Sequence, residues 1–281
     1  MPKRILCIND ISCVGRCSLT VILPILATMG IEACPLPTAV LSTHTGGFGA
    51  PAVLDMRGFA HDALTHYKSI KLCFDAIYSG YYKDENALSV LLEARAQNKD
   101  AICVIDTVLG DNGKMYTGLQ EGMPLAMAKA CKGADIITPN ATESALLLGV
   151  DFNENPLSTK QEVIARMEQL ETLGAKATVL TGVCLKDESC YNVCKRQGEN
   201  TVFVRYLPQS GSYPGTGDMF ASVLTGSVMQ GKSLETAIDI AANFVRKSVE
   251  MANIENNKAC FGVPFEQNLG IIALKENSAH D

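Results

Sequence analysis

The residues best suited to chemistry lie close together in residues 213–220, at the start of an apolar-periodic segment that runs on to residue 229. Gly215, Thr216 and Gly217 come directly before Asp218, where a helix should begin. A helix N-terminus exposes unpaired N–H groups and positive partial charge, and glycine lets an anion approach its backbone. A carboxylate there can take a proton from a group that attacks the anion. The stretch predicts phosphoryl transfer, although a turn followed by a first-turn Asp would look the same.

Length, charge and composition narrow the class of protein. The chain has 281 residues, 47% of them hydrophobic and 19% charged, and we expect a single domain over residues 1–281. The net charge of −6 argues against nucleic acid as a partner. No apolar run approaches the roughly 20 residues of a membrane span, and the first residues lead into a strand rather than a signal peptide. We therefore expect a cytoplasmic protein without a membrane partner.

Eleven cysteines are spread over the chain, and no two have the Cys-x-x-Cys spacing. Cys184, Cys190 and Cys194 could approach one another, but no histidine lies near them in the sequence. Because the cytoplasm keeps thiols reduced, we expect reduced, mostly structural cysteines rather than disulfides or a zinc site.

Strand-like and helix-like segments alternate along the chain, which predicts an α/β fold. We expect a three-layer α/β/α sandwich with a mostly parallel central sheet. Prolines 35 and 37 suit an edge or irregular strand better than a central one. The predicted strands are 4–8, 31–41, 76–78, 101–106, 135–138 and 177–181, followed by a hairpin of 191–194 and 201–206. The predicted helices are 18–29, 51–67, 84–97, 119–131, 142–148, 159–173, 218–229 and 234–251.

Polar residues stand where several of these strands end. Ligands of parallel sheets bind at the carboxyl ends of the strands, so these side chains should share one rim with residues 215–218. The residues concerned are Asp10, Ser12, Asp106, Thr138, Asn140, Glu143 and Thr181.

Three motifs in a fixed order resemble those of the ribokinase-like superfamily, and within it the chain is similar to the pyridoxal kinases. The motifs are Asp106-x-x-x-Gly110, Thr138-Pro139-Asn140-x-x-Glu143 and Gly215-Thr216-Gly217-Asp218. The loop at 42–47 resembles the ring-binding loop of those enzymes, and Ser79-Gly80-Tyr81 resembles their second substrate segment. The similarity extends from residue 5 to beyond residue 251.

The resemblance implies ATP-dependent phosphorylation of the 5′-hydroxymethyl group of pyridoxal, pyridoxine or pyridoxamine, in vitamin B6 salvage, by a homodimer. Asp218 would be the general base, with the backbone of residues 215–217 stabilising the transferring phosphoryl group. Asp106 and Glu143 would lie near Mg²⁺ and the ATP phosphates, and K⁺ is the candidate monovalent ion. On the nucleotide side would lie Thr138, Asn140 and Thr181, and on the side of the pyridine ring Asp10, Ser12, His44, Thr45, Gly46 and Tyr81.

Taken singly, most of these residues have plainer interpretations. Asp106 and Asn140 could be turn or helix caps, and Glu143 a solvated first-turn charge. His44 could be a loop residue without a ligand, and Tyr82 could take the place of Tyr81.

Two positions depart from the pyridoxal kinase pattern. Asp10 stands where those enzymes usually carry a small hydroxyl residue, and a carboxylate there could prefer a cationic amine, as in pyridoxamine, over an aldehyde. Thr181 stands where they frequently carry a lysine, which changes the expected phosphate contacts.

Two other functions stay open on the sequence. A hydroxymethylpyrimidine kinase of thiamin synthesis would use the same fold, although its relatives begin with a richer Gly-Ser stretch than residues 10–15 provide. A catalytically silent B6 binder would have no need of Asp218.

Overall fold

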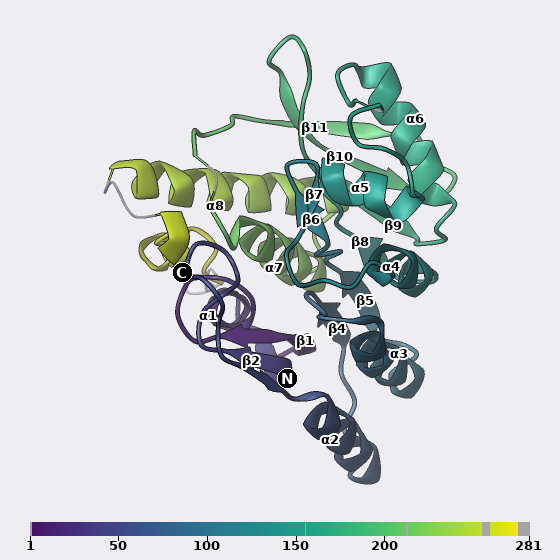
Figure 1. Ribbon diagram of the computed structural model, residues 1–281, viewed down its shortest axis with the longest axis vertical. Coiled ribbons are helices and arrows are strands. Elements are labelled where there is room, and N and C mark those ends of the chain that lie inside the picture. Colours follow the sequence, from purple (N-terminus) through teal and green to yellow (C-terminus); the bar gives the residue numbers. More distant parts are fainter. Residues whose placement is uncertain (1, 155, 212, 255–258, 275–281) are drawn as a thin grey trace, which may run out of the picture.

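One mixed sheet runs through the computed structural model, which describes residues 2–154, 156–211, 213–254 and 259–274. Within those residues the sheet has nine strands in the order β11-β10-β9-β8-β5-β4-β1-β2-β3, with helices on both faces (Figure 1). The expected three-layer sandwich with a mostly parallel sheet is confirmed.

The strands fall into a parallel centre and antiparallel edges. The parallel strands are β1 (Arg4–Ser12), β2 (Glu32–Leu41), β4 (Ala76–Ser79), β5 (Ile102–Ile105), β8 (Ile136–Ile137) and β9 (Ala177–Cys184). The antiparallel edge strands are β3 (Val53–Asp55), β10 (Cys190–Arg196) and β11 (Val202–Tyr206). A separate small hairpin consists of β6 (Gly110–Asp111) and β7 (Lys114–Met115).

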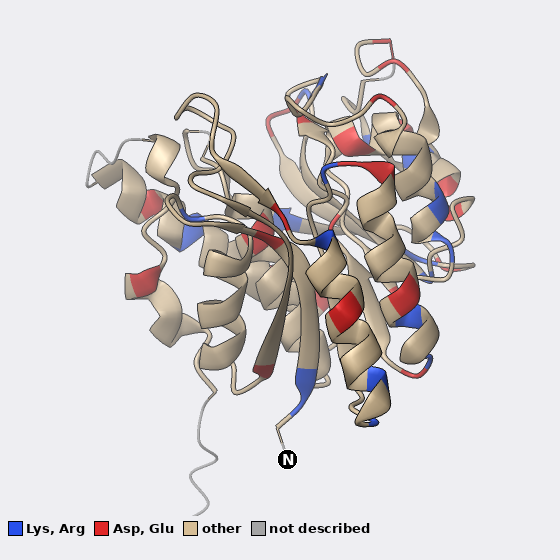
Figure 2. Cartoon of the chain, turned by 60° about the horizontal axis from the view of Figure 1, so that its bottom comes forward, with Lys and Arg blue, Asp and Glu red and all other residues tan. Residues whose placement is uncertain are grey.

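The helices connect the strands and cover the sheet. They are α1 (Leu19–Thr28), α2 (Arg57–Ser69), α3 (Leu88–Gln97), α4 (Met123–Cys131), α5 (Ala141–Leu148), α6 (Lys160–Glu171), α7 (Thr216–Met229) and α8 (Leu234–Ile254). Short 3₁₀ turns are η1 (Glu85–Ala87), η2 (Ala259–Phe261) and η3 (Glu266–Ile271). In Figure 2, acidic and basic residues are intermixed on the helices that flank the sheet, as expected for helices with one apolar face.

Alternation of side chains along the strands divides the core in two. Ile5 and Cys7 of β1 pack with α1, α7 and α8 on one face of the sheet. Leu6 and Ile8 pack with α2, α3 and α4 on the other face, because successive strand residues point in opposite directions. The sheet is thus buried on both sides, and its carboxyl ends are left as the place for a site.

Two predicted helices differ from the structure. Residues 53–55 form β3 instead of the first turn of a helix, because they pair with the end of β2, and α2 begins only at Arg57. Helix α4 begins at Met123, after the unpredicted β6–β7 hairpin and a stretch of turns. The prolines of β2 fit the expectation of an edge, since β3 pairs only with residues 39–41.

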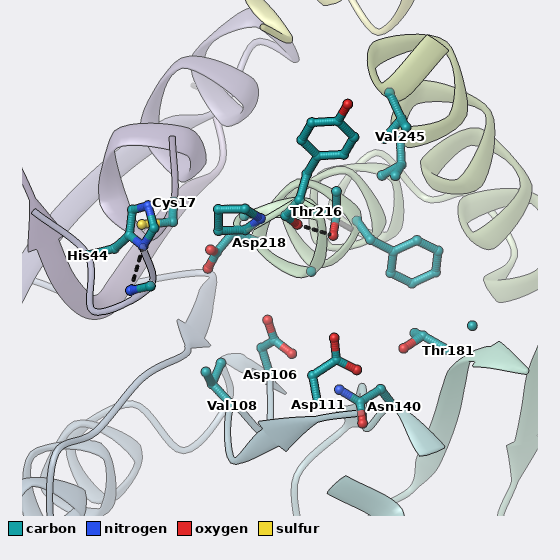
Figure 3. A pocket seen from close by; sticks show the side chains of 18 of the residues that line it. Cys17, His44, Asp106, Val108, Asp111, Asn140, Thr181, Thr216, Asp218 and Val245 are labelled. Atoms are coloured by element: carbon teal, nitrogen blue, oxygen red, sulfur yellow. Dashed lines mark hydrogen bonds between the residues drawn. The ribbon is translucent and has the colours of Figure 1, made fainter. Parts of the chain in front are cut away.

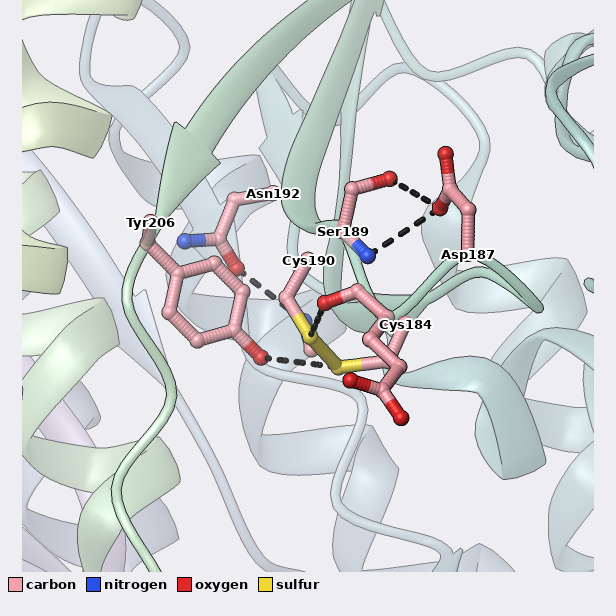
Figure 4. Close-up of a disulfide and its surroundings, with 8 residues drawn as sticks. Cys184, Asp187, Ser189, Cys190, Asn192 and Tyr206 are labelled. Atoms are coloured by element: carbon pink, nitrogen blue, oxygen red, sulfur yellow. Dashed lines mark hydrogen bonds between the residues drawn. A yellow bond between two sulfur atoms is a disulfide. The ribbon is translucent and has the colours of Figure 1, made fainter.

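The cysteine prediction was wrong for one pair. Cys184 and Cys190 form a disulfide, whereas the other nine cysteines are free (Figure 4). The two residues lie opposite each other on the antiparallel strands β9 and β10, with their Cα atoms 4.1 Å apart. Sequence spacing could not reveal the bridge, because the register of two strands brings the thiols together.

Among the described residues, no helix is both long and apolar enough to cross a bilayer.

Candidate active site

A cavity of about 740 Å³ opens at the carboxyl ends of the parallel strands (Figure 3). Every residue that the sequence predicted for a site lies along its wall, including residues more than 200 positions apart. They are Asp10, Ser12, His44, Thr45, Gly46, Tyr81, Asp106, Thr138, Asn140, Glu143, Thr181, Gly215, Thr216, Gly217 and Asp218. The rim expected from the strand ends is therefore present as one cavity.

Helix α7 presents its N-terminus to this cavity. No side chain caps that end of the helix, so its first N–H groups are available to an anion. Gly215 has φ of 83°, and a Cβ at this position would lie 1.9 Å from the carbonyl oxygen of Arg16. Only glycine fits there, because the backbone at 215 both turns left-handed and touches the 16–17 segment. At Gly217, by contrast, a Cβ would meet nothing nearer than Asp106 Oδ2, at 4.0 Å.

Asp218 lies in the first turn of α7 and is partly exposed to the cavity. Its Oδ2 accepts a hydrogen bond of 2.9 Å from the backbone N–H of Ser18. Loss of water around the carboxylate and the nearby charges of Asp106 and Asp10 raise the pKa of Asp218 to about 8, against the opposing Ser18 N–H. Figure 3 shows the carboxylates of Asp106, Asp111 and Asp218 pointing into the same space. A carboxylate with this pKa can act as a base near neutral pH.

Asp106 and Glu143 are buried on the opposite wall. Asp106 Oδ1 accepts from Thr138 Oγ1 at 2.9 Å, while Glu143 accepts from the N–H groups of Leu109 and Asn140 at 3.1 and 3.0 Å. Burial raises the pKa of both carboxyls, and for Glu143 the charge of Asp106 adds to the effect. Because Glu143 is buried, its interpretation as a solvated surface charge is wrong. Asn140 and Glu143 form a capping box at the start of α5. Asn140 is therefore a helix cap and also lines the cavity.

The donor set at Asp106 and Glu143 suits magnesium. Magnesium takes oxygen ligands, often only one or two carboxylates, and completes its shell with water and phosphate oxygens. In the described part of the chain, no group of three or more His, Cys, Asp and Glu is arranged to hold a metal by itself. Two carboxylates that share a cavity with an uncapped helix N-terminus therefore fit a metal that arrives with a phosphate ligand.

Asp10 and Ser12 end β1 and are both buried. Ser18 Oγ donates to Asp10 Oδ1 at 2.6 Å, and Ser12 Oγ donates to Asp10 Oδ2 at 3.0 Å. Burial raises the pKa of Asp10, and the two serine hydroxyls oppose that rise. Asp10 is thus a buried carboxylate held in one orientation at the cavity wall.

His44 is held by backbone groups at both ring nitrogens. Its Nδ1 accepts from the N–H of Gly46 at 3.0 Å, and its Nε2 lies 2.6 Å from the carbonyl oxygen of Cys260. Because a carbonyl can only accept, Nε2 carries the proton. The ring lines the cavity, as predicted, but neither nitrogen is left for a hydrogen bond to a ligand. His44 instead ties the 43–49 loop to the 259–262 segment.

The ambiguity between the two neighbouring tyrosines is resolved. Tyr82 is fully buried, and its hydroxyl is 2.7 Å from Ser79 Oγ, whereas Tyr81 lines the cavity. Asn9 positions this segment, because its Oδ1 accepts from the N–H groups of Asp10 and Tyr81, both at 2.9 Å.

Several lining residues were not predicted. Ser18 has the sequence signature of an N-cap for α1, yet its side chain makes no capping bond and turns to Asp10 instead. Its φ of 56° is strained for a residue with a side chain, which is frequent at functional sites. No sequence pattern would have identified the wall at the far end of the cavity, to which α8 and the C-terminal segment contribute. Val245, Arg246, Ala259 and Cys260 are the lining residues from these two segments, and Cys17, Val108, Asp111 and Tyr116 line the cavity elsewhere.

Known proteins match this chain over most of its length. The model of a family described as phosphomethylpyrimidine kinase matches residues 23–263. The putative pyridoxal kinase of Schizosaccharomyces pombe is 26% identical over 89% of this chain and 82% of its own. Human pyridoxal kinase is 26% identical over 89% of this chain and 90% of its own.

Solved structures agree in fold over nearly the full length. A putative phosphomethylpyrimidine kinase from Bacteroides thetaiotaomicron, solved with pyridoxal, is 34% identical with a TM-score of 0.89, covering 99% of this chain and 98% of that one. The pyridoxal kinase of Lactobacillus plantarum is 29% identical with a TM-score of 0.88, covering 96% of each chain.

Proposed function

The chain belongs to the phosphomethylpyrimidine kinase family and has the ribokinase-like fold, and from this premise we propose that it is an ATP-dependent kinase of vitamin B6. The substrate is pyridoxal, pyridoxine or pyridoxamine, and the acceptor is the 5′-hydroxymethyl group. The relatives support this choice, since those of S. pombe and human are named pyridoxal kinases and the B. thetaiotaomicron relative was solved with pyridoxal.

One observation carries the chemistry: Asp218, with a pKa near 8, lies in the first turn of a helix whose N-terminus faces the cavity uncapped. The γ-phosphoryl group of ATP binds at the N–H groups of residues 215–217, which stabilise the negative charge of the transition state. Asp218 accepts the proton of the hydroxymethyl group as the oxygen of that group attacks the γ-phosphorus. The bond from the γ-phosphorus to the bridging oxygen breaks, and ADP leaves with that oxygen. The N–H of Ser18 keeps the carboxylate oriented for that transfer.

Asp106 and Glu143 are the residues that would hold Mg²⁺, directly or through water. When bound, the ion neutralises phosphate charge as the phosphoryl group moves. Thr138, Asn140 and Thr181 line the nucleotide side, and Thr45, Gly46 and Tyr81 border the pyridine ring. The homodimer rests on the resemblance to pyridoxal kinases and the cytoplasmic location on the sequence pattern, and analytical ultracentrifugation tests the first.

A second candidate substrate is hydroxymethylpyrimidine, because the matching family is described as phosphomethylpyrimidine kinase. It would use the same base and the same anion site. A silent B6 binder is disfavoured by the complete set of residues 215–218 at the cavity wall.

The test measures ATP-dependent phosphorylation of the three B6 vitamers and hydroxymethylpyrimidine by the wild type and by Asp218→Asn. We expect turnover of B6 vitamers, and a fall in kcat of about 10² or more in the variant. Turnover confined to the pyrimidine would move the function to thiamin synthesis. No turnover of any of the four compounds would refute the kinase proposal.

A further inference from the structure

Asp10 is a buried carboxylate without a cationic partner among the residues that the structure describes. Its side chain is 3% exposed, and it takes part in none of the ion pairs among the described residues. His44 is the nearby basic side chain, but its two nitrogens are bound to Gly46 and Cys260. Two serine hydroxyls use one lone pair on each oxygen of Asp10, and a carboxylate has about four such sites. Asp10 therefore retains acceptor capacity toward the cavity that it lines.

The cavity as a whole is acidic, so the side chains around Asp10 add negative charge and do not balance its own. Five carboxylates line it, whereas among the described residues Arg246 is the one arginine or lysine that lines it. Arg246 pairs with Glu250 on α8, at 3.2 Å. Burying an unpaired carboxylate costs free energy, so such groups normally have a positive partner. A ligand is the remaining source of that charge.

Ser18 fixes Asp10 relative to the proposed catalytic base. Its backbone N–H donates to Asp218 and its hydroxyl donates to Asp10, so that a single residue spans the two carboxylates. The backbone of Ser18 keeps a strained positive φ in making both bonds. Asp10 and Asp218 are consequently both tied to Ser18, and both line the cavity.

The B6 vitamers present two neighbouring substituents to such a pair. The hydroxymethyl group that accepts phosphate and the group that differs between vitamers are on adjacent ring carbons. The variable group is an aldehyde in pyridoxal, a hydroxymethyl in pyridoxine and an aminomethyl in pyridoxamine, and only the last is positively charged at neutral pH. We infer that Asp10 binds this ammonium group and that the enzyme prefers pyridoxamine over the other two vitamers. The inference rests on the proposed kinase function and specifies its substrate.

The three groups differ in what they offer Asp10. An ammonium group donates a charge-assisted hydrogen bond, and a hydroxyl donates a weaker neutral one. An aldehyde oxygen can only accept, so it would face the carboxylate with no hydrogen to share. From the usual strength of hydrogen bonds to charged groups, we expect kcat/KM to favour pyridoxamine over pyridoxal by about tenfold to a hundredfold. Because the B. thetaiotaomicron relative was solved with pyridoxal, the expectation is a preference and not an exclusion.

The experiment compares kcat/KM for the three vitamers in the wild type, Asp10→Asn and Asp111→Asn. Asparagine keeps the shape of Asp10 and removes its charge. Its amide oxygen can accept from one serine, and its NH2 group can donate to the other if that hydroxyl rotates. Asp111 is the matched control, since it is a carboxylate that lines the same cavity, is bonded to Asn112 and is exposed. We expect Asp10→Asn to reduce the preference for pyridoxamine to within about threefold of pyridoxal, and Asp111→Asn to leave the ratio unchanged.

Pyridoxamine acetylated on its amine gives a second readout that needs no variant, because it removes the positive charge from the substrate. Its kcat/KM with the wild-type protein should fall to the level of pyridoxal or below. Turnover of all three vitamers without a preference, or a preference that Asp10→Asn leaves intact, overturns the inference while the kinase function stands. A changed K⁺ requirement with an unchanged vitamer ratio in Asp10→Asn assigns the site to a metal cation and also overturns it. Absence of turnover with every vitamer refutes the proposed function itself.

Discussion

Replacing Gly217 with alanine should leave the fold intact and weaken phosphoryl transfer, whereas the same change at Gly215 should damage both. Gly217 is the second residue of α7, and a Cβ there would extend into open cavity, 4.0 Å from the nearest atom, Asp106 Oδ2. Alanine is a better helix former than glycine by up to about 1 kcal/mol, so the variant should be as stable as the wild type or slightly more. The new methyl group would occupy the space where the phosphate must approach the backbone.

Gly215 differs because its backbone has no room for a side chain. A non-glycine residue at φ 83° costs about 1–2 kcal/mol, and its Cβ would lie 1.9 Å from a carbonyl oxygen that must then move. We expect a total loss of about 2 kcal/mol or more, which lowers Tm by about 4 °C or more. The displaced segment holds Arg16 and Cys17, next to the Ser18 that orients Asp218, so activity should fall as well.

Thermal unfolding followed by circular dichroism measures stability, and initial rates at varied ATP measure catalysis. For Gly217→Ala we expect an unchanged or higher Tm and a fall in kcat/KM for ATP of about tenfold or more. The backbone N–H remains, but the methyl group holds the phosphate away from it, and a donor that no longer reaches an oxyanion costs up to about 10²–10³. Gly58→Ala is the control, because Gly58 is the second residue of α2 and a Cβ there meets nothing within 4 Å. That variant should keep full activity. Full activity of Gly217→Ala would refute the placement of the phosphate, and wild-type stability of Gly215→Ala would refute the close approach to Arg16.

Three further predictions follow from the carboxylates and the disulfide. The kcat/KM for the vitamer should rise with pH up to about 8, because only ionised Asp218 accepts a proton, and a flat profile between pH 6 and 9 would contradict this. The raised pKa means that folded Asp218 binds its proton more tightly than the unfolded chain does, so its contribution to stability is present below about pH 4 and lost as the pH rises through about 8. The Tm of Asp218→Asn should therefore exceed that of the wild type by an amount that grows from pH 5 to pH 8 and then levels off. Scanning calorimetry of both proteins at pH 5 and pH 8 tests whether the difference increases. Thiol titration of the unfolded, unreduced protein should give nine free thiols, and eleven after reduction. The double variant Cys184→Ser, Cys190→Ser should lose about 2 kcal/mol of the free energy of unfolding. Eleven thiols without reductant would show that the bridge is absent.

Much of the fold could be predicted from local pattern. Alternating strand and helix periodicity implied the layers, and the hairpin of β10 and β11 was visible as two short strands around Gly198. Elements whose existence depends on a partner were missed. Residues 53–55 form a strand only because the end of β2 lies beside them, and the Cys184–Cys190 bridge depends on strand register.

The candidate site divides in a similar way. Asp106, Thr138 and Asp218 could be placed on one rim because parallel strands end at the same edge of a sheet. Ser18 could not, since its sequence context is that of an ordinary N-cap. The bonds that give it a role join it to Asp10 and, across 200 positions of sequence, to Asp218.

The amino-acid sequence by itself determined the layered architecture and the groups that meet at its rim, because periodicity and the residues at strand ends are local properties of the chain. The tertiary structure decided how those groups are tuned. It turned both nitrogens of His44 toward backbone atoms, buried Glu143 beside Asp106, and left Asp10 without a counter-charge within the described part of the chain. The pKa of Asp218 rises to about 8 through loss of water and through the charges of Asp106 and Asp10, which belong to distant parts of the sequence. Such effects depend on distance and burial, which no stretch of sequence contains.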